Sequence, residues 1–182
     1  MINADLKNRI NEIYQQGNSS GKLTAFENVP PKKLRSAVQS YASVMGNDET
    51  VIFLYDDTVF GSAKEGFLLT SKRLYQKNIM EKGSFLDVAN IINMKFGKEG
   101  IVSSIYANSM KIDITQVVDD NGKRAVFNVL SSTIKLLVGG GTSQAVASTP
   151  AQAAMPRSTA CGGCGAMLSP QSAACEYCGK IN

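Results

Sequence analysis

All four cysteines of the 182-residue chain lie near its C-terminus, as two Cys-x-x-Cys pairs. The pairs are Cys161/Cys164 and Cys175/Cys178, and residues 165–174 connect them. The segment from Cys161 to Asn182 is too short to bury enough apolar surface to fold around a hydrophobic core. Four thiolates at this spacing can close a tetrahedral site, to which each pair supplies two sulfur ligands. We therefore expect residues 160–182 to fold around one structural zinc ion, with metal binding and folding coupled.

The same cysteines are compatible with two disulfides, with a redox-active pair or with iron. Disulfides require an oxidising compartment, and the polar start of the chain from Asn3 onward lacks the apolar segment of a secretory signal. A redox pair belongs at the start of a helix in a βαβ unit, not at the end of a linker. Zinc is therefore favoured over disulfides, the choice between zinc and iron stays open, and the expected location is the cytoplasm.

The chain contains no histidine, which limits the chemistry it can perform. This excludes Ser-His-Asp and Cys-His catalysis and every metal site that uses histidine. A zinc ion with four cysteine ligands has no open position for water or substrate. Asp56 and Asp57 are adjacent, so on a strand they face opposite ways, and hydrogen bonds to loop amides suit them better than a catalytic pair. We expect a protein that is not an enzyme and has no small-molecule substrate.

Two amphipathic helices are predicted in the N-terminal segment, residues 1–46. Residues 4–16 place Leu6, Ile10 and Ile13 on one face. A second helix is predicted to start at Pro30-Pro31 and to end at Gly46. The simplest expectation is that both apolar stripes pack onto the domain that follows.

Residues 47–138 have the pattern of a mainly β, antiparallel domain. Segments rich in branched and aromatic residues predict strands at 50–55, 67–70, 73–77, 85–92, 101–106 and 110–115. Asn121-Gly122 predicts a hairpin that adds a seventh strand at 123–127. The apolar stripe of residues 126–138 predicts a helix that closes one end of a small barrel or sandwich.

A change of composition separates this domain from the cysteine pairs. Residues 139–159 consist mainly of Gly, Ser, Thr, Ala, Gln and Pro, which is typical of a flexible linker. The chain is therefore predicted to comprise a helical segment (1–46), a β domain (47–138), a linker (139–159) and a metal module (160–182).

Two parts of the chain resemble known modules. The cysteine pairs, with Gly165 and Gly179 directly after them, resemble a zinc ribbon. Glu49 to Thr70, followed by Lys72-Arg73-Leu74-Tyr75, resembles the first three strands of bacterial pleckstrin-homology-like domains. This second resemblance covers residues 49–138 and implies a seven-stranded bent barrel capped by a C-terminal helix. It also implies a binding scaffold and not an enzyme.

The net charge of +4 is mild, but basic residues gather around the first loops and the third strand of the predicted barrel. In the pleckstrin-homology-like family this region presents a phosphate-binding patch, so the resemblance implies a candidate surface for anionic lipid or another anion. The candidates are Lys64, Lys72, Arg73, Lys77 and Lys82. Acidic residues such as Glu65 and Glu81 are interspersed, and a mixed solvated surface is the competing interpretation.

These features favour a two-module adaptor. The pleckstrin-homology-like module is expected to bind a protein or a membrane surface, and the zinc ribbon to contact a second partner. Exposed strand edges and grooves beside the capping helix are the expected peptide-binding surfaces. The alternative is a nucleic-acid-associated regulator that uses the ribbon and the basic loops. It is less favoured because Lys180 and Tyr177 are the ribbon's only cation and aromatic residue.

Overall fold

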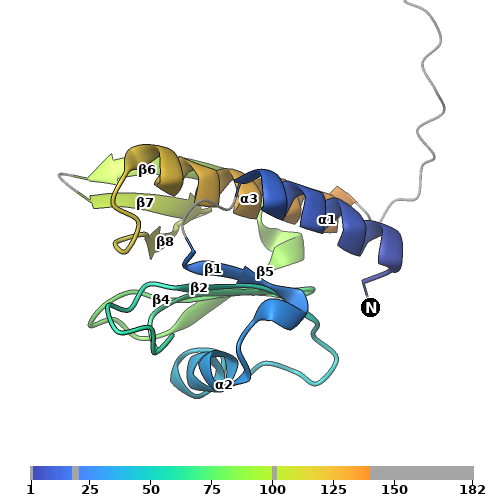
Figure 1. The fold of residues 1–182 in the computed structure, drawn as a ribbon, viewed down its shortest axis with the longest axis horizontal. Helices are drawn as coiled ribbons and strands as arrows, with labels where there is room; N and C mark the ends of the chain where they lie inside the picture. Colours follow the sequence, from blue (N-terminus) through green and yellow to red (C-terminus); the bar gives the residue numbers. More distant parts are fainter. Residues whose placement is uncertain (1, 18–20, 100–101, 140–182) are drawn as a thin grey trace, which may run out of the picture. The chain divides into compact units, whose positions relative to one another are not determined.

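The computed structural model describes residues 2–17, 21–99 and 102–139. The chain divides into two units, residues 1–143 and residues 144–182, and all the described residues belong to the first. The described part is built from two antiparallel sheets with flanking helices (Figure 1). This confirms the mainly β class predicted from the sequence.

The larger sheet has five strands in sequential antiparallel order. They are β1 (Leu23–Ala25), β2 (Val51–Asp56), β3 (Gly66–Thr70), β4 (Arg73–Lys77) and β5 (Ser84–Asp87). The central strands are buried on both faces, since all five residues of β3 and five of the six residues of β2 are buried. This explains why their sequences are nearly continuous apolar runs and do not alternate with polar residues.

Alternate side chains of these strands supply two separate hydrophobic clusters. Tyr55 and Phe67 belong to the first cluster, and their rings stack with centroids 5.2 Å apart. Leu54 belongs to the second cluster, together with Ala37 of α2 (Pro31–Ser40). Figure 1 shows α2 on one side of the sheet and the two longer helices on the other.

A second sheet and two helices cover the face opposite α2. The sheet consists of β6 (Met94–Glu99), β7 (Val102–Ala107) and β8 (Met110–Asp113), and the helices α1 (Ala4–Gly17) and α3 (Asp120–Gly139) run side by side (Figure 1). Ile10 of α1 and Ile134 of α3 are buried in the same cluster as Tyr55. Both N-terminal helices therefore pack on the larger sheet of their own chain, one on each face.

The hairpin predicted at Asn121-Gly122 is wrong, because these residues lie in the first turn of α3. The Asp119 carboxylate accepts a hydrogen bond from the Gly122 amide at 2.7 Å and so caps the start of the helix. The segment predicted as a strand at 123–127 is consequently helical, and the closing helix begins earlier than predicted, at Asp120. An Asp-Asn-Gly sequence suits a helix N-terminus as well as a turn, and here the apolar stripe that follows decides for the helix.

Two strands, β1 and β6, were not predicted from the sequence. β1 has only three residues, and β6 contains a glycine and two lysines, which weaken a strand signal. The alternation of Met94 and Phe96 with Lys95 is the pattern that indicates β6. Lys95 covers the ring of Tyr106 on β7, with its Nζ 5.2 Å from the ring centroid. This cation–π contact explains how a lysine is accommodated in the strand.

The strand predicted over residues 85–92 ends early, at Asp87. There the Val88 amide donates a hydrogen bond to the Lys72 carbonyl oxygen at 2.7 Å, and the chain enters a short 3-10 helix, η2 (Val88–Asn90). This turn carries the chain from the larger sheet to the smaller one. The other predicted strands up to residue 115 agree with the structure to within two residues.

Gly66→Ala is expected to destabilise the fold by about 2–4 kcal/mol. Gly66 opens β3 with a φ of +123°, which residues with a Cβ rarely adopt, and an added methyl group would overlap the Tyr55 carbonyl oxygen. Urea unfolding measures the effect. Gly139→Ala is the matched control, because the added methyl group meets open space there, and it should change the free energy of unfolding by less than about 1 kcal/mol. Equal stabilities of the two variants would contradict this account.

Candidate functional site

The predicted metal ligands Cys161, Cys164, Cys175 and Cys178 lie outside the described residues. Within residues 2–17, 21–99 and 102–139, no three Cys, Asp or Glu side chains are grouped as a metal site would require. In the same ranges, no helix is both long and apolar enough to cross a membrane. The basic residues predicted as an anion-binding patch, by contrast, are all described.

These five basic residues lie at two opposite ends of the larger sheet. β4 runs from Arg73 to Lys77, and because a strand rises about 3.3 Å per residue, the two positions are roughly 13 Å apart. Lys72 precedes Arg73 at one end of the sheet. Lys64, in the β2–β3 loop, and Lys82, in the β4–β5 loop, belong with Lys77 to the other end. The structure therefore does not bring the five residues together.

Arg73 and Lys72 are engaged by carboxylates of their own chain. Arg73 donates from Nη1 to Glu49 Oε1 at 3.1 Å and from Nε to Asp87 Oδ1 at 3.0 Å, and Lys72 pairs with Asp48. The Glu49 side chain is only 1% exposed, so Arg73 compensates a charge that water cannot reach. We conclude that Arg73 stabilises this end of the sheet, and that its guanidinium group is already occupied.

At the opposite end, Lys64, Lys77 and Lys82 lie in or next to loops. Ser40 connects the first two, since its hydroxyl donates to the Lys64 carbonyl oxygen at 2.8 Å and accepts from Lys77 Nζ at 3.1 Å. Lys64 and Lys82 are exposed, and the ion pairs formed among the described residues do not include them. Three of the five predicted cations are therefore gathered at this end.

Asp56 orders the β2–β3 loop at the same end. Its Oδ1 accepts hydrogen bonds from the Thr58 amide at 3.0 Å and the Ala63 amide at 3.1 Å, and its Oδ2 lies 2.7 Å from Lys33 Nζ. Burial alone would raise the pKa of Asp56, but the hydrogen bonds from Lys33 and Thr58 outweigh burial and hold this pKa below its ordinary value. One carboxylate thus ties together both ends of the loop and α2.

Asp57 holds a different segment, the one that precedes α3. Its Oδ1 accepts hydrogen bonds from the Thr115 amide at 2.8 Å, the Gln116 amide at 2.9 Å and the Tyr55 hydroxyl at 3.0 Å. Burial raises the pKa of Asp57 above its ordinary value. The structure confirms that the two adjacent aspartates hydrogen-bond to loop amides, and each binds a different segment.

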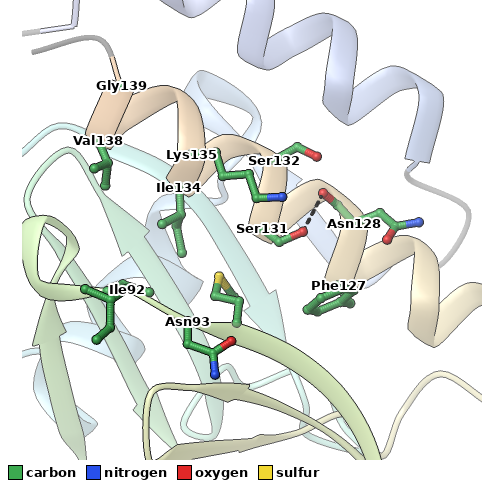
Figure 2. A pocket seen from close by; sticks show the side chains of 12 residues that line it. Ile92, Asn93, Phe127, Asn128, Ser131, Ser132, Ile134, Lys135, Val138 and Gly139 are labelled. Atoms are coloured by element: carbon green, nitrogen blue, oxygen red, sulfur yellow. Dashed lines mark hydrogen bonds between the residues drawn. The ribbon is translucent and has the colours of Figure 1, made fainter. Parts of the chain in front are cut away.

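A groove of about 490 Å³ lies beside the C-terminal half of α3 (Figure 2). One wall is α3, and the other is the segment that joins η2 to β6. Ile134 and Val138 point from α3 toward the wall that carries Ile92, and Phe127 lies at one end. The residues that line the groove are Ile91, Ile92, Asn93, Met94, Phe127, Asn128, Ser131, Ser132, Ile134, Lys135, Val138 and Gly139.

The groove combines exposed apolar surface with polar groups. Ile92 is 91% exposed and Val138 is 46% exposed, so apolar side chains border a space that is open to solvent. The Ser131 hydroxyl donates to the Asn128 carbonyl oxygen at 3.3 Å. Lys135 is exposed and is the charged side chain of the lining. Such a mixture suits binding of a chain with both apolar and polar groups.

Sequence reasoning predicted a groove beside the closing helix but named none of its residues. One wall, residues 91–94, falls where the sequence predicted the end of a strand, so its position could not be inferred. On α3, the polar residues Asn128, Ser131 and Ser132 interrupt the apolar stripe. This interruption is the sequence signal that marks the groove side of the helix.

Asp56→Asn is expected to lower the free energy of unfolding at pH 7 by about 2 kcal/mol, a value moderated by the partial exposure of Lys33. Because the folded-state pKa of Asp56 lies below its ordinary value of 3.8, its stabilising contribution is fully present above that value. The contribution is lost as the pH falls through the lower, folded-state pKa. The difference between wild type and variant should therefore shrink under acidic conditions. Urea unfolding between pH 7 and pH 3 measures it.

Asp48→Asn is the control for this titration, because Asp48 pairs with Lys72 on the surface and its side chain is 71% exposed. This variant should have nearly the stability of the wild type at every pH. An Asp56→Asn variant that is as stable as wild type at pH 7 would show that the carboxylate does not order the loop.

The chain matches no protein-family model, no curated protein and no solved structure. A function for this protein is therefore argued from the geometry of its own residues. Two features of the structure bear on function. They are the groove beside α3 and the loops at the end of the larger sheet where Lys64, Lys77 and Lys82 lie.

Proposed function

We propose that the protein is a non-enzymatic adaptor that binds an extended peptide of a partner protein in the groove beside α3. The observation that carries this proposal is the groove itself, which is bordered by exposed apolar side chains and by polar groups able to orient a ligand. Its lining of apolar side chains with a few polar groups is typical of ligand-binding sites, and the exposed apolar side chains at its border leave it accessible to an extended chain.

The edge of β6 supports binding of an extended chain. β6 pairs with β7 on one side and is the end strand of the smaller sheet. In the described part of the chain, no strand covers its other edge. Met94, the first residue of β6, also lines the groove. A peptide that enters the groove can therefore continue as an added strand, with main-chain hydrogen bonds for affinity and apolar contacts for specificity.

Lys135 indicates that the bound peptide carries an acidic residue. It is exposed at the border of the groove, and the other lining residues are uncharged. A carboxylate of the peptide placed near Lys135 would add a charge-assisted contact. The expected ligand therefore has apolar side chains at alternating positions and an acidic residue beside them.

We also propose that β2 to β8 and α3 form a pleckstrin-homology-like bent barrel. Four consecutive antiparallel strands (β2–β5), three further ones (β6–β8) and a closing helix follow one another along the chain. The support is the number of strands and the closing helix, with β6 in place of the strand expected at 123–127 and with α1, β1 and α2 as additions at the N-terminus. A binding role is consistent with such a scaffold, although the scaffold does not specify the ligand.

Residues 160–182 complete the proposed adaptor as a zinc ribbon. The support is the donor set of Cys161, Cys164, Cys175 and Cys178, since four thiolates in two Cys-x-x-Cys pairs match the preference of Zn²⁺ for tetrahedral sulfur ligands. A ribbon that contacts a second partner would bring two proteins together through one chain. Simultaneous binding of both modules would raise the overall affinity through effective concentration.

Selection of a displayed random peptide library against the full chain tests the groove. Enriched peptides should share apolar residues at alternating positions and an acidic residue. Ile92→Arg and Val138→Arg should each weaken binding of a selected peptide by at least about tenfold, because each places a bulky charge against the apolar side chains. Fluorescence anisotropy of the labelled peptide measures the affinity.

Val44→Arg is the matched control, since Val44 is also partly exposed, at 56%, but lies outside the groove. It should leave peptide affinity unchanged. If no peptides are enriched, or if Val44→Arg weakens binding as much as the groove variants, the groove is not the binding site.

The zinc proposal is tested by elemental analysis and native mass spectrometry of protein purified without added metal. One zinc ion per chain is expected, and Cys164→Ser should lose it because three thiolates hold zinc far more weakly than four. A metal-free chain whose mass shows two disulfides would refute the ribbon. Iron in place of zinc would keep the metal site and change its identity.

A further inference from the structure

The outer edge of β5 is open in the described part of the chain. β5 is the last strand of the larger sheet and pairs with β4 on one side. Residues 81–85 and Asp87 are exposed, and Phe85 is 44% exposed although it is aromatic. An exposed sheet edge carries main-chain groups that can pair with a strand of another molecule. The edge of β5 is therefore a candidate interaction surface.

The pairing of β4 with β5 shows which main-chain groups face this edge. The Val88 amide donates a hydrogen bond to the Lys72 carbonyl oxygen directly opposite, at 2.7 Å. Hydrogen-bonded and non-hydrogen-bonded pairs alternate along an antiparallel ladder, so the main-chain groups of Leu86 also point to β4. The N–H and C=O groups of Phe85 and Asp87 consequently point outward, and no described residue bonds to them.

Two other sheet edges are closed by side chains of the same chain. At β8, the Asn78 side chain accepts a hydrogen bond from the Asp113 amide at 2.9 Å and donates to the Lys111 carbonyl oxygen at 3.1 Å. At β1, the Tyr14 hydroxyl donates to the Leu23 carbonyl oxygen at 3.0 Å. These contacts use main-chain groups that an added strand would need. Among the described residues, no side chain closes the edge of β5 in this way.

We propose that β5 pairs with β5 of a second copy of the chain, so that the two larger sheets join into one. The two strands are antiparallel about a two-fold axis, which is the commonest symmetry of protein dimers. This contact uses a different edge from the one proposed for the peptide. Dimer formation and peptide binding therefore do not depend on each other.

The outward main-chain groups define the register of the two strands. With the two-fold axis beside Phe85, this residue bonds to Phe85 of the second copy, and Asp87 bonds to Gly83 of the second copy. The two aromatic rings are then neighbours, which stabilises a sheet. The Arg73 guanidinium carbon lies 5.2 Å from the centroid of the Phe85 ring and helps to hold the ring in place. A register centred on Asp87 would instead place two carboxylates opposite each other.

The charges at the two ends of β5 also fit a second copy. Lys82, just before the strand, is exposed, and Asp87 ends the strand with a side chain that is 51% exposed. Antiparallel pairing brings the start of one strand to the end of the other, so Lys82 of each copy lies near Asp87 of its partner. An edge with a lysine at one end and an aspartate at the other is thus complementary to itself.

Asp87→Pro and Asp87→Ala form a matched pair of variants that tests this contact. Both lose the carboxylate and its hydrogen bond with Arg73, but only proline removes the outward N–H group. Asp87 has a φ of −67°, which is the value that proline requires, and its N–H group does not bond to β4. The folded single chain should therefore accept proline here, and circular dichroism checks this.

Sedimentation velocity of the full chain over a dilution series measures dimer formation. The wild type and Asp87→Ala should form dimers at high concentration. Asp87→Pro should raise the dissociation constant at least about tenfold over that of Asp87→Ala, because each copy loses one donor at the contact. Phe85→Ser should also weaken the dimer. Ile92→Ser, which changes an exposed apolar residue of the groove, should dimerise as wild type does.

Amide hydrogen exchange measured by NMR gives a second readout of the same contact. The amides of Phe85 and Asp87 should exchange rapidly in dilute protein, where they face water, and slowly where the dimer is formed. The amide of Leu86 bonds to β4 in either state, so its exchange is the internal control.

A chain that stays monomeric at every concentration would overturn the proposal. Equal dissociation constants for Asp87→Pro and Asp87→Ala would overturn it too, as would a dimer in which the Phe85 amide still exchanges rapidly. A dimer that Ile92→Ser dissociates would place the contact at the groove and not at β5. Peptide affinity is measured separately, so failure of this proposal and failure of the peptide proposal are distinguishable.

Discussion

Burial of both faces of β2 and β3 is the constraint on which the rest of the described structure depends. Strands that are apolar at nearly every position need a partner layer on each face, which a single sheet or an isolated hairpin does not provide. The helix α2 covers one face through Ala37, and the smaller sheet with α1 and α3 covers the other through residues such as Ile10 and Ile134. The N-terminal helices are consequently part of the core and not accessories to it.

The sequence was sufficient for those parts of the fold whose pattern is local. The apolar runs predict β2 and β3, and the apolar stripe predicts α3. These patterns are informative because the residues that become buried are apolar. Asn121-Gly122 led to a wrong prediction, because these residues suit either a turn or the start of a helix. Only the cap formed by Asp119 distinguishes the two structures. β6 was missed because an edge strand needs few apolar residues, and its lysine is accommodated by contact with Tyr106.

The candidate surfaces were less accessible to sequence reasoning, because they depend on which residues tertiary structure brings together. Arg73 and Lys77 are close in sequence, yet they lie at opposite ends of one strand. Arg73 is also hydrogen-bonded to Glu49. Conversely, Ile92 and Val138 are distant in sequence, yet both border the groove beside α3. Their exposure has no sequence signature, since an apolar residue is equally compatible with packing against a core.

The helix α3 extends from the loop that follows β8 to the far end of the groove. Its first turn follows directly after Val118, and its last residue, Gly139, lines the groove. A helix of 20 residues extends about 30 Å. A peptide bound in the groove would therefore be held at a fixed distance from the loop that precedes α3, because one continuous helix connects the two places.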